Sequence, residues 1–190
     1  KSLALLRQAA EDAAKKEGVA FVDVYGSMFS VMAKAKASYG DDYAFAGPAL
    51  DGVHPQNAGA LVMAYAFLKA MKLDGHIGTV VYDASTDKAT VTDGHKVLNC
   101  RGGNIQIESL RYPFCFFDAP KSRTSGSPDS TRDIIALFPF NDELNRFMLV
   151  VSKPGAAKLK VTWGVKSKVF EADRLSKGVN LAAEFLEMAQ

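Results

Sequence analysis

The sequence predicts an α/β segment over residues 1–75, followed by a mostly antiparallel β-rich segment over residues 76–190 that ends in a helix. Helical periodicity alternates with a short apolar run in the first segment, and alternation of apolar with polar residues dominates the second. Of the 190 residues, 48% are hydrophobic and 23% charged, which is typical of a globular chain with a buried core. We place the boundary near residues 73–76, where the pattern changes.

The first segment reads as helix, strand, helix, loop and helix. Residues 3–16 are amphipathic and end at Gly18, a frequent helix stop. The run "VAFVDV", residues 19–24, predicts a strand buried on both faces of a parallel sheet. Residues 27–38 predict a helix with Ser27 as N-cap. After a loop rich in Gly, Asp and Pro, Pro55 is placed to begin a helix that runs to about Lys72.

This first segment contains one convincing strand, and a parallel strand needs a neighbour for its hydrogen bonds. The partner strands are therefore expected on another chain, on an absent N-terminal portion or in the β-rich segment. The sequence begins with Lys1 inside a helical pattern and ends in one, which predicts a piece of a longer protein.

In the second segment, β-branched and polar residues alternate from residue 78 to 100, and Asp93-Gly94 predicts a two-residue hairpin turn. The stretches "NIQIESLRYPFCFF", "RFMLVVS" and "KLKVTWG" continue the same pattern. A polar loop is expected between the first two of these stretches, and "SKGVNLAAEFLEMAQ" predicts a terminal helix. The strand order remains open between a sandwich, a barrel and an open sheet.

Charge and hydropathy narrow the classes of partner. The 23 basic and 21 acidic residues give a formal charge of +2 without a basic run, so no nucleic-acid partner is predicted. The apolar stretch over residues 58–71 is too short for a membrane span and carries Lys69. No cofactor is predicted, because "CRGGN" lacks the strand–loop–helix context of a phosphate loop.

Several polar residues are interpreted as structural. Cys100 and Cys115 could pair in an exported protein, but two separate buried thiols are favoured. His76 and His95 are interpreted as solvated turn residues rather than metal ligands, because no ligand spacing recurs. Asp41 and Asp42 are interpreted as a solvated pair. For the aromatic residues Trp163, Tyr112 and Phe114, core packing is favoured over an exposed platform for sugar binding.

The stretch "LDGVHPQNAG" carries the strongest candidate for chemistry. Asp51 and His54 are the residue types that form the acid and base of a Ser-His-Asp triad, in which the carboxylate orients the imidazole. A helix beginning at Pro55 would disfavour the imidazolium form of His54 and so favour a base. On residue types alone, a turn with a capping histidine is the favoured interpretation.

The block "DGVHPQNAGALVMAYAFLKAM", after a helix, the run "AFVDV" and a loop, resembles the last motif block of the SGNH/GDSL hydrolases. In that family, Asp-x-x-His supplies the triad acid and base, which correspond here to Asp51 and His54. The resemblance covers about residues 1–72 and implies the C-terminal part of a flavodoxin-like, three-layer α/β fold. The β-rich remainder resembles, more weakly, the tail of some bacterial members.

The resemblance implies a serine ester hydrolase that acts on a small-molecule or polymeric ester. No segment resembles the Gly-Asp-Ser nucleophile block or the oxyanion-hole blocks, so the nucleophile is expected on a missing N-terminal portion or a companion chain, and this chain alone should be nearly inactive. Ser27 and Ser30 lack the Gly-Asp-Ser order and are interpreted as capping or packing residues. Members are often exported, so a secreted or periplasmic location is compatible with the resemblance, and any export signal is expected before Lys1.

A noncatalytic function is the alternative. The β-rich segment would then bind carbohydrate or a protein partner, and Asp51 and His54 would be a structural remnant. A Gly-Asp-Ser block encoded upstream of Lys1 would favour the hydrolase, whereas a start codon close before Lys1 would favour the binding module.

Overall fold

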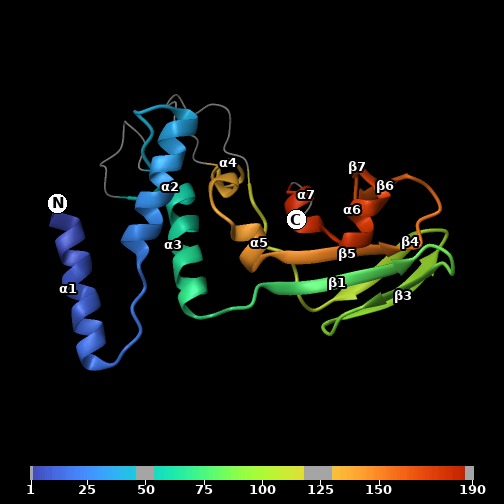
Figure 1. The fold of residues 1–190 in the computed structure, drawn as a ribbon, viewed down its shortest axis with the longest axis horizontal. Helices are drawn as coiled ribbons and strands as arrows, with labels where there is room; N and C mark the ends of the chain where they lie inside the picture. Colours follow the sequence, from blue (N-terminus) through green and yellow to red (C-terminus); the bar gives the residue numbers. More distant parts are fainter. Residues whose placement is uncertain (1, 46–53, 118–129, 187–190) are drawn as a thin grey trace. The chain divides into compact units, whose positions relative to one another are not determined.

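A computed structural model describes residues 2–45, 54–117 and 130–186 and shows a mixed α/β chain (Figure 1). The chain forms two compact units. Unit 1 comprises residues 1–73 and 117–140, and unit 2 comprises residues 74–116 and 141–190. The chain therefore leaves unit 1 after Leu73 and returns to it before completing unit 2.

Unit 1 is helical in its described part. Its elements are α1 (Ser2–Glu17), α2 (Val24–Tyr39), α3 (Gln56–Ala70), α4 (Thr131–Ile134) and the 3-10 helix η1 (Ile135–Leu137). Helices α2 and α3 run side by side (Figure 1). They bury small and branched side chains against one another, among them Val31, Ala35 and Val62. Small side chains at the interface allow the two helices to approach each other closely.

The helices of unit 1 begin and end largely as expected. Gly18 stops α1 with a φ of +67°, a conformation that glycine adopts without steric strain. Asp23, not Ser27, caps α2, because the Asp23 carboxylate accepts a hydrogen bond of 2.8 Å from the Gly26 N–H. The predicted N-cap at Ser27 is therefore wrong by one helical turn.

The strand expected over residues 19–24 is also wrong. Residues 19–23 have no regular structure, Val24 is the first residue of α2, and Val19 is 63% exposed. Within the described residues of unit 1 no strand is formed, so this apolar run has no ladder to join. A single extended segment cannot satisfy its own backbone groups, which explains the outcome.

Unit 2 is built on a mixed sheet of four strands in the order β2-β1-β5-β8. The strands are β1 (His76–Asp83), β2 (Lys88–Val91), β5 (Arg146–Ser152) and β8 (Val179–Asn180). The two longest strands, β1 and β5, are parallel, with Val80 opposite Leu149, and the other pairings in the sheet are antiparallel. The expectation of a mostly antiparallel segment is thus met except at the centre of the sheet.

Two separate hairpins complete the strands of unit 2: β3 (His95–Arg101) with β4 (Asn104–Ser109), and β6 (Lys158–Trp163) with β7 (Lys166–Glu171). Their two-residue turns are Gly102-Gly103 and Gly164-Val165, in which all three glycines have positive φ. The sequence "CRGGN" is therefore a hairpin turn. Asp93-Gly94 forms a turn as well, but it joins β2 to β3, which belong to different sheets, and so the expected hairpin is wrong.

One carboxylate ties two turns of unit 2 together. Asp87, beside the turn that joins β1 to β2, accepts hydrogen bonds from the Gly102 N–H at 2.6 Å and the Gly103 N–H at 3.1 Å. The Tyr82 hydroxyl donates a third at 2.9 Å. These bonds, led by the one from Gly102, lower the pKa of Asp87. The carboxylate therefore holds the β3–β4 turn to the neighbouring sheet.

The end of the chain is not the single helix that the sequence predicted. It contains α6 (Ala172–Lys177), the short strand β8 and α7 (Leu181–Glu184). Gly178, with a φ of +102°, ends α6, and the Asn180 side chain caps α7 by accepting from the Ala182 N–H. Residues 111–117, expected as a strand continuation, have no regular structure. They are held by Asn145, whose side-chain oxygen accepts from the Phe114 N–H at 2.8 Å.

Candidate functional site

Of the two candidate catalytic residues, Asp51 and His54, the structure describes His54, which lies at the start of α3. His54 is exposed and directly precedes Pro55, which occupies the N-cap position of that helix. Pro55 was expected at the first helical position, so the helix begins one residue later than predicted. Asp51 lies outside the described residues, so the geometry of the Asp51–His54 pair remains a prediction.

The glycine of the motif has a packing role that the sequence did not reveal. Gly59 is buried in the first turn of α3, where its N–H donates to the Pro55 carbonyl at 2.9 Å. A Cβ at Gly59 would lie 2.6 Å from the Pro55 Cβ and 3.1 Å from the Phe45 Cγ. Any larger residue would therefore displace the segments that flank His54.

Aromatic packing fixes the chain that leads toward the motif. Phe45 is 5% exposed, and its ring meets that of Tyr43 edge to face at 5.9 Å. Tyr43 is 2% exposed and also contacts the ring of Tyr39 at the end of α2, at 5.5 Å. Such buried ring pairs hold a loop more rigidly than isolated side chains do. The described start of the motif loop is thus anchored to α2, and its far end begins α3.

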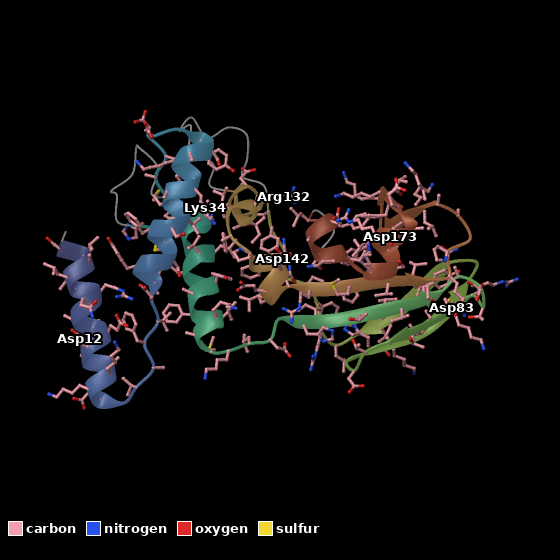
Figure 2. All side chains as sticks on the ribbon, in the orientation of Figure 1. Asp12, Lys34, Asp83, Arg132, Asp142 and Asp173 are labelled. Carbon is pink, nitrogen blue, oxygen red and sulfur yellow. The ribbon has the colours of Figure 1, made fainter. Side chains whose placement is uncertain are left out.

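The two serines considered as alternative nucleophiles lie on α2. Ser27 is half-buried and Ser30 is exposed. Both line a shallow hollow of about 390 Å3 in unit 1, together with Asp23, Lys34 and Tyr65. Lys34, labelled in Figure 2, donates from Nζ to the Leu137 carbonyl at 3.1 Å. Neither serine stands at the end of a strand, where the nucleophile of an α/β hydrolase is presented.

An ion pair joins the N-terminal end of α2 to α1. Arg7 of α1 donates to Asp23 at 2.8 Å and to Glu11 at 2.7 Å. The hydrogen bond from Arg7, followed by that from the Gly26 N–H, lowers the pKa of Asp23. Asp23 therefore stays ionised at neutral pH and serves as a cap and an anchor for α1, which is a structural role.

The other two histidines lie in unit 2 and are not the solvated turn residues expected. His95 is half-buried at the start of β3, with Nδ1 2.9 Å from the Ser109 hydroxyl and Nε2 2.9 Å from the Ile77 carbonyl. Because a carbonyl only accepts, Nε2 carries a proton. His76 is half-buried in β1, 3.2 Å from the Thr79 hydroxyl. Their partners give both residues a role in packing.

The remaining candidates divide between core and surface. Trp163 is half-buried and contacts Phe147 and Phe185, as expected. Tyr112 is 72% and Phe114 42% exposed, so the core packing expected for these two residues is wrong.

Cys100 and Cys115 are free thiols, and Cys115 is exposed rather than buried. Asp41 and Asp42 are exposed, as expected. Sequence reasoning missed Arg111, which lines a cavity in unit 2, because the residues around that cavity are far apart in the chain and carry no shared pattern.

Two further properties concern the described residues alone. They contain no cluster of three or more His, Cys, Asp or Glu side chains with the geometry to hold a metal ion. They also contain no helix whose length and hydropathy would allow it to cross a membrane.

Comparisons with known proteins give one informative result. No family model matches the sequence, and no curated protein matches it. Among solved structures, the chain is similar to BT4096, a gut microbial diltiazem-metabolizing enzyme, with a TM-score of 0.70 and 26% sequence identity. The match covers 94% of this chain and 40% of that enzyme, so the chain spans less than half the length of the structure it resembles.

Proposed function

We propose that this chain is part of a serine ester hydrolase of the SGNH/GDSL type. The observation that carries the proposal is the structural match, over 94% of this chain, to part of a drug-metabolizing enzyme. Diltiazem is itself an acetate ester, so ester cleavage is one route to its metabolism. The Asp-x-x-His block of the sequence, whose His54 directly precedes Pro55 and α3, agrees with that chemistry. We also propose a flavodoxin-like, three-layer fold for the whole enzyme.

In this proposal Asp51 accepts a hydrogen bond from His54 Nδ1–H, and His54 Nε2 removes the proton of a serine hydroxyl. The serine oxygen then attacks the ester carbonyl, and the proton passes from His54 to the departing alcohol. Water releases the acid from the acyl-enzyme in the same manner, with His54 again the base. The nucleophile and the oxyanion donors belong to polypeptide outside these 190 residues, as a preceding segment or a companion chain.

The apolar surface of unit 1 supports such an arrangement. Leu3, Leu5 and Leu6 of α1 are 65–72% exposed, and Phe29 of α2 is 65% exposed. Large apolar side chains gathered on helices usually mark a surface that another part of a protein covers. Strands supplied by further polypeptide would also give the run over residues 19–23 the ladder that it lacks here.

The test uses the longest natural open reading frame that contains these residues, assayed with p-nitrophenyl acetate. We expect His54→Ala to lower kcat by about a millionfold, as loss of a triad base does, and Asp51→Asn by about ten-thousandfold. His76→Ala is the matched control and should retain activity, because His76 contacts Thr79 in unit 2.

Labelling with a fluorophosphonate, followed by peptide mapping, locates the nucleophile. We expect the labelled serine outside the 190 residues. Labelling of Ser27 or Ser30 would contradict the proposed position of the nucleophile. Robust turnover by the 190-residue chain alone, unchanged in His54→Ala, would overturn the proposal as a whole.

A further inference from the structure

Unit 2 contains a cavity of about 620 Å3 between its three sheets. This volume lies within the range of small-molecule sites, about 300–1,000 Å3. One face of the mixed sheet contributes Val80, Phe147 and Leu149, which are at most 9% exposed. The cavity therefore reaches the apolar core of the unit.

The two hairpins supply the other sides of the cavity. Ile105 and Ile107 of β4 line it from one hairpin, and Leu159, Val161 and Trp163 of β6 line it from the other. These side chains are only partly buried, although they belong to the same apolar cluster as the sheet. Because neither hairpin pairs with the mixed sheet, no ladder draws the three sheets into closer contact. An apolar space between them is the result.

The charged lining residues are all of one sign. Arg111 and Lys160 are the charged residues along the cavity, and no Asp or Glu is among its lining residues. The Lys160 side chain lies on the outer face of β6, because it alternates with Leu159 and Val161 and is paired with the exposed Val169. Both basic residues are exposed. Within the described part of the chain, neither side chain forms a hydrogen bond or an ion pair with another residue. An apolar cavity bordered by the guanidinium of Arg111, without an acidic residue in its lining, favours a ligand with an apolar body and an anionic head.

We propose that unit 2 binds a small amphipathic carboxylate, whose acyl or aryl body lies against Ile107, Val161 and Trp163 and whose carboxylate contacts Arg111. The guanidinium presents paired N–H groups that match the two oxygens of a carboxylate. This binding site involves neither Asp51 nor His54. It is therefore a function beyond the proposed hydrolysis, and it can be tested independently of that proposal.

Trp163 provides the measurement, because it is the single tryptophan of the chain and lines the cavity. The 190-residue chain is titrated with dodecanoate below its micellar concentration, and the emission of Trp163 is followed. We expect a saturable change with one site per chain. Dodecyltrimethylammonium, which has the same alkyl chain and the opposite charge, should bind at least tenfold more weakly. Equal binding of the two, or no saturable change with dodecanoate, would overturn the proposal.

Two pairs of variants distinguish a specific binding site from nonspecific adsorption to apolar surface. Val161→Phe fills the cavity, and Val169→Phe makes the same change at a residue of β7 that is 64% exposed. We expect only Val161→Phe to abolish the Trp163 response. Arg111→Gln should weaken dodecanoate about tenfold and leave dodecanol unchanged, whereas Lys96→Gln, at an exposed position of β3, should change neither.

Arg111→Gln keeps the test decisive if Val161→Phe fails to fold, because Arg111 is at the surface. Equal loss of affinity in Val161→Phe and Val169→Phe, or equal effects of Arg111→Gln on dodecanoate and dodecanol, would show adsorption to apolar surface and reject the site.

Discussion

The leucines of α1 in unit 1 and those of β5, α6 and α7 in unit 2 have opposite environments. Leu3, Leu5 and Leu6 of α1 are 66%, 72% and 65% exposed, whereas Leu149, Leu175 and Leu181 of unit 2 are 8%, 0% and 8% exposed. Unit 2 pairs its own strands and closes an apolar cluster, while the described part of unit 1 offers helices without a sheet. The difference shows that an apolar stripe predicts a helix face but not the partner that covers it.

The largest expected effect tests this contrast directly. Leu175→Ala should lower the free energy of unfolding by about 2–5 kcal/mol, because it leaves a cavity at a fully buried position. Leu5→Ala, on the exposed face of α1, should change it by about 0.5 kcal/mol or less. Urea unfolding followed by far-UV circular dichroism measures both. Equal losses of unfolding free energy in the two variants would show that α1 is covered in solution, and the contrast between the two units would then be wrong.

The next effect concerns the buried polar anchor of unit 2. Asn145 is fully buried, accepts from the Phe114 N–H at 2.8 Å and donates to the Asn141 side chain at 2.8 Å. Asn145→Ala leaves the Phe114 N–H without this acceptor and should lower the free energy of unfolding by about 1–3 kcal/mol.

Limited trypsin digestion after Arg111 gives a second measurement of the same variant. Cleavage should become faster in Asn145→Ala, because the irregular segment over residues 111–117 loses its anchor. Asn99→Ala, at an exposed position of β3, is the control and should match the parent chain. Unchanged cleavage in Asn145→Ala would mean that other contacts hold this segment.

A hairpin turn of unit 2 should show a smaller effect. Gly103 has a φ of +76°, which residues with a Cβ adopt at an expense of about 1–2 kcal/mol. Gly103→Ala should therefore lower the free energy of unfolding by about 1 kcal/mol, measured through Trp163 emission in urea. Gly155→Ala is the matched control, because Gly155 has no positive φ and no atom within 4 Å of its Cβ position. Equal effects would refute the conformational explanation.

An effect of similar size lies in unit 1 and depends on pH. Asp23→Ala removes the cap of α2 and should lower the free energy of unfolding by about 1 kcal/mol at pH 7. The pKa of Asp23 is lowered in the folded state, chiefly by the hydrogen bond from Arg7. The folded state therefore binds fewer protons. This stabilisation is fully present above the ordinary carboxyl pKa and is lost as the pH falls from there through the lowered pKa of the folded state.

Urea unfolding at pH 7 and at pH 3, followed by circular dichroism, checks this dependence. The difference between the parent chain and Asp23→Ala should shrink at the lower pH. Asp41→Ala, which removes an exposed carboxylate from the same unit, should show no such change. A difference that stays constant between the two pH values would contradict the role of the ionised carboxylate.

The local signals in the sequence predicted much of the fold. Gly18 ended α1 as expected, Pro55 preceded α3 within one residue, and period-2 alternation located β1, β5 and β6. The helix over residues 27–38 began three residues early, because Asp23 competes as a cap with Ser27. The candidate site stays a prediction, since His54 lies at the start of α3 and Asp51 lies outside the described residues.

The failures share a physical cause. The run over residues 19–24 has strand composition but no partner, and Gly178 with Asn180 divides the predicted terminal helix by inserting a strand that pairs with β5. Asp93-Gly94 forms its turn, yet the strands that it joins pair with others. Each error concerns which segments meet, which the local pattern does not encode.

Residue types and spacing alone therefore located the three helices of the first segment and the glycine turns, because a helix satisfies its backbone within itself and a turn depends on one or two φ angles. The choice of Asp51 and His54 depended on the resemblance of their block to the SGNH/GDSL hydrolases. Tertiary structure alone decided which apolar runs became strands and which histidines were held by partners. It also brought Arg111 to the apolar cavity of unit 2, because strand pairing and cavities arise from contacts between residues distant in the chain.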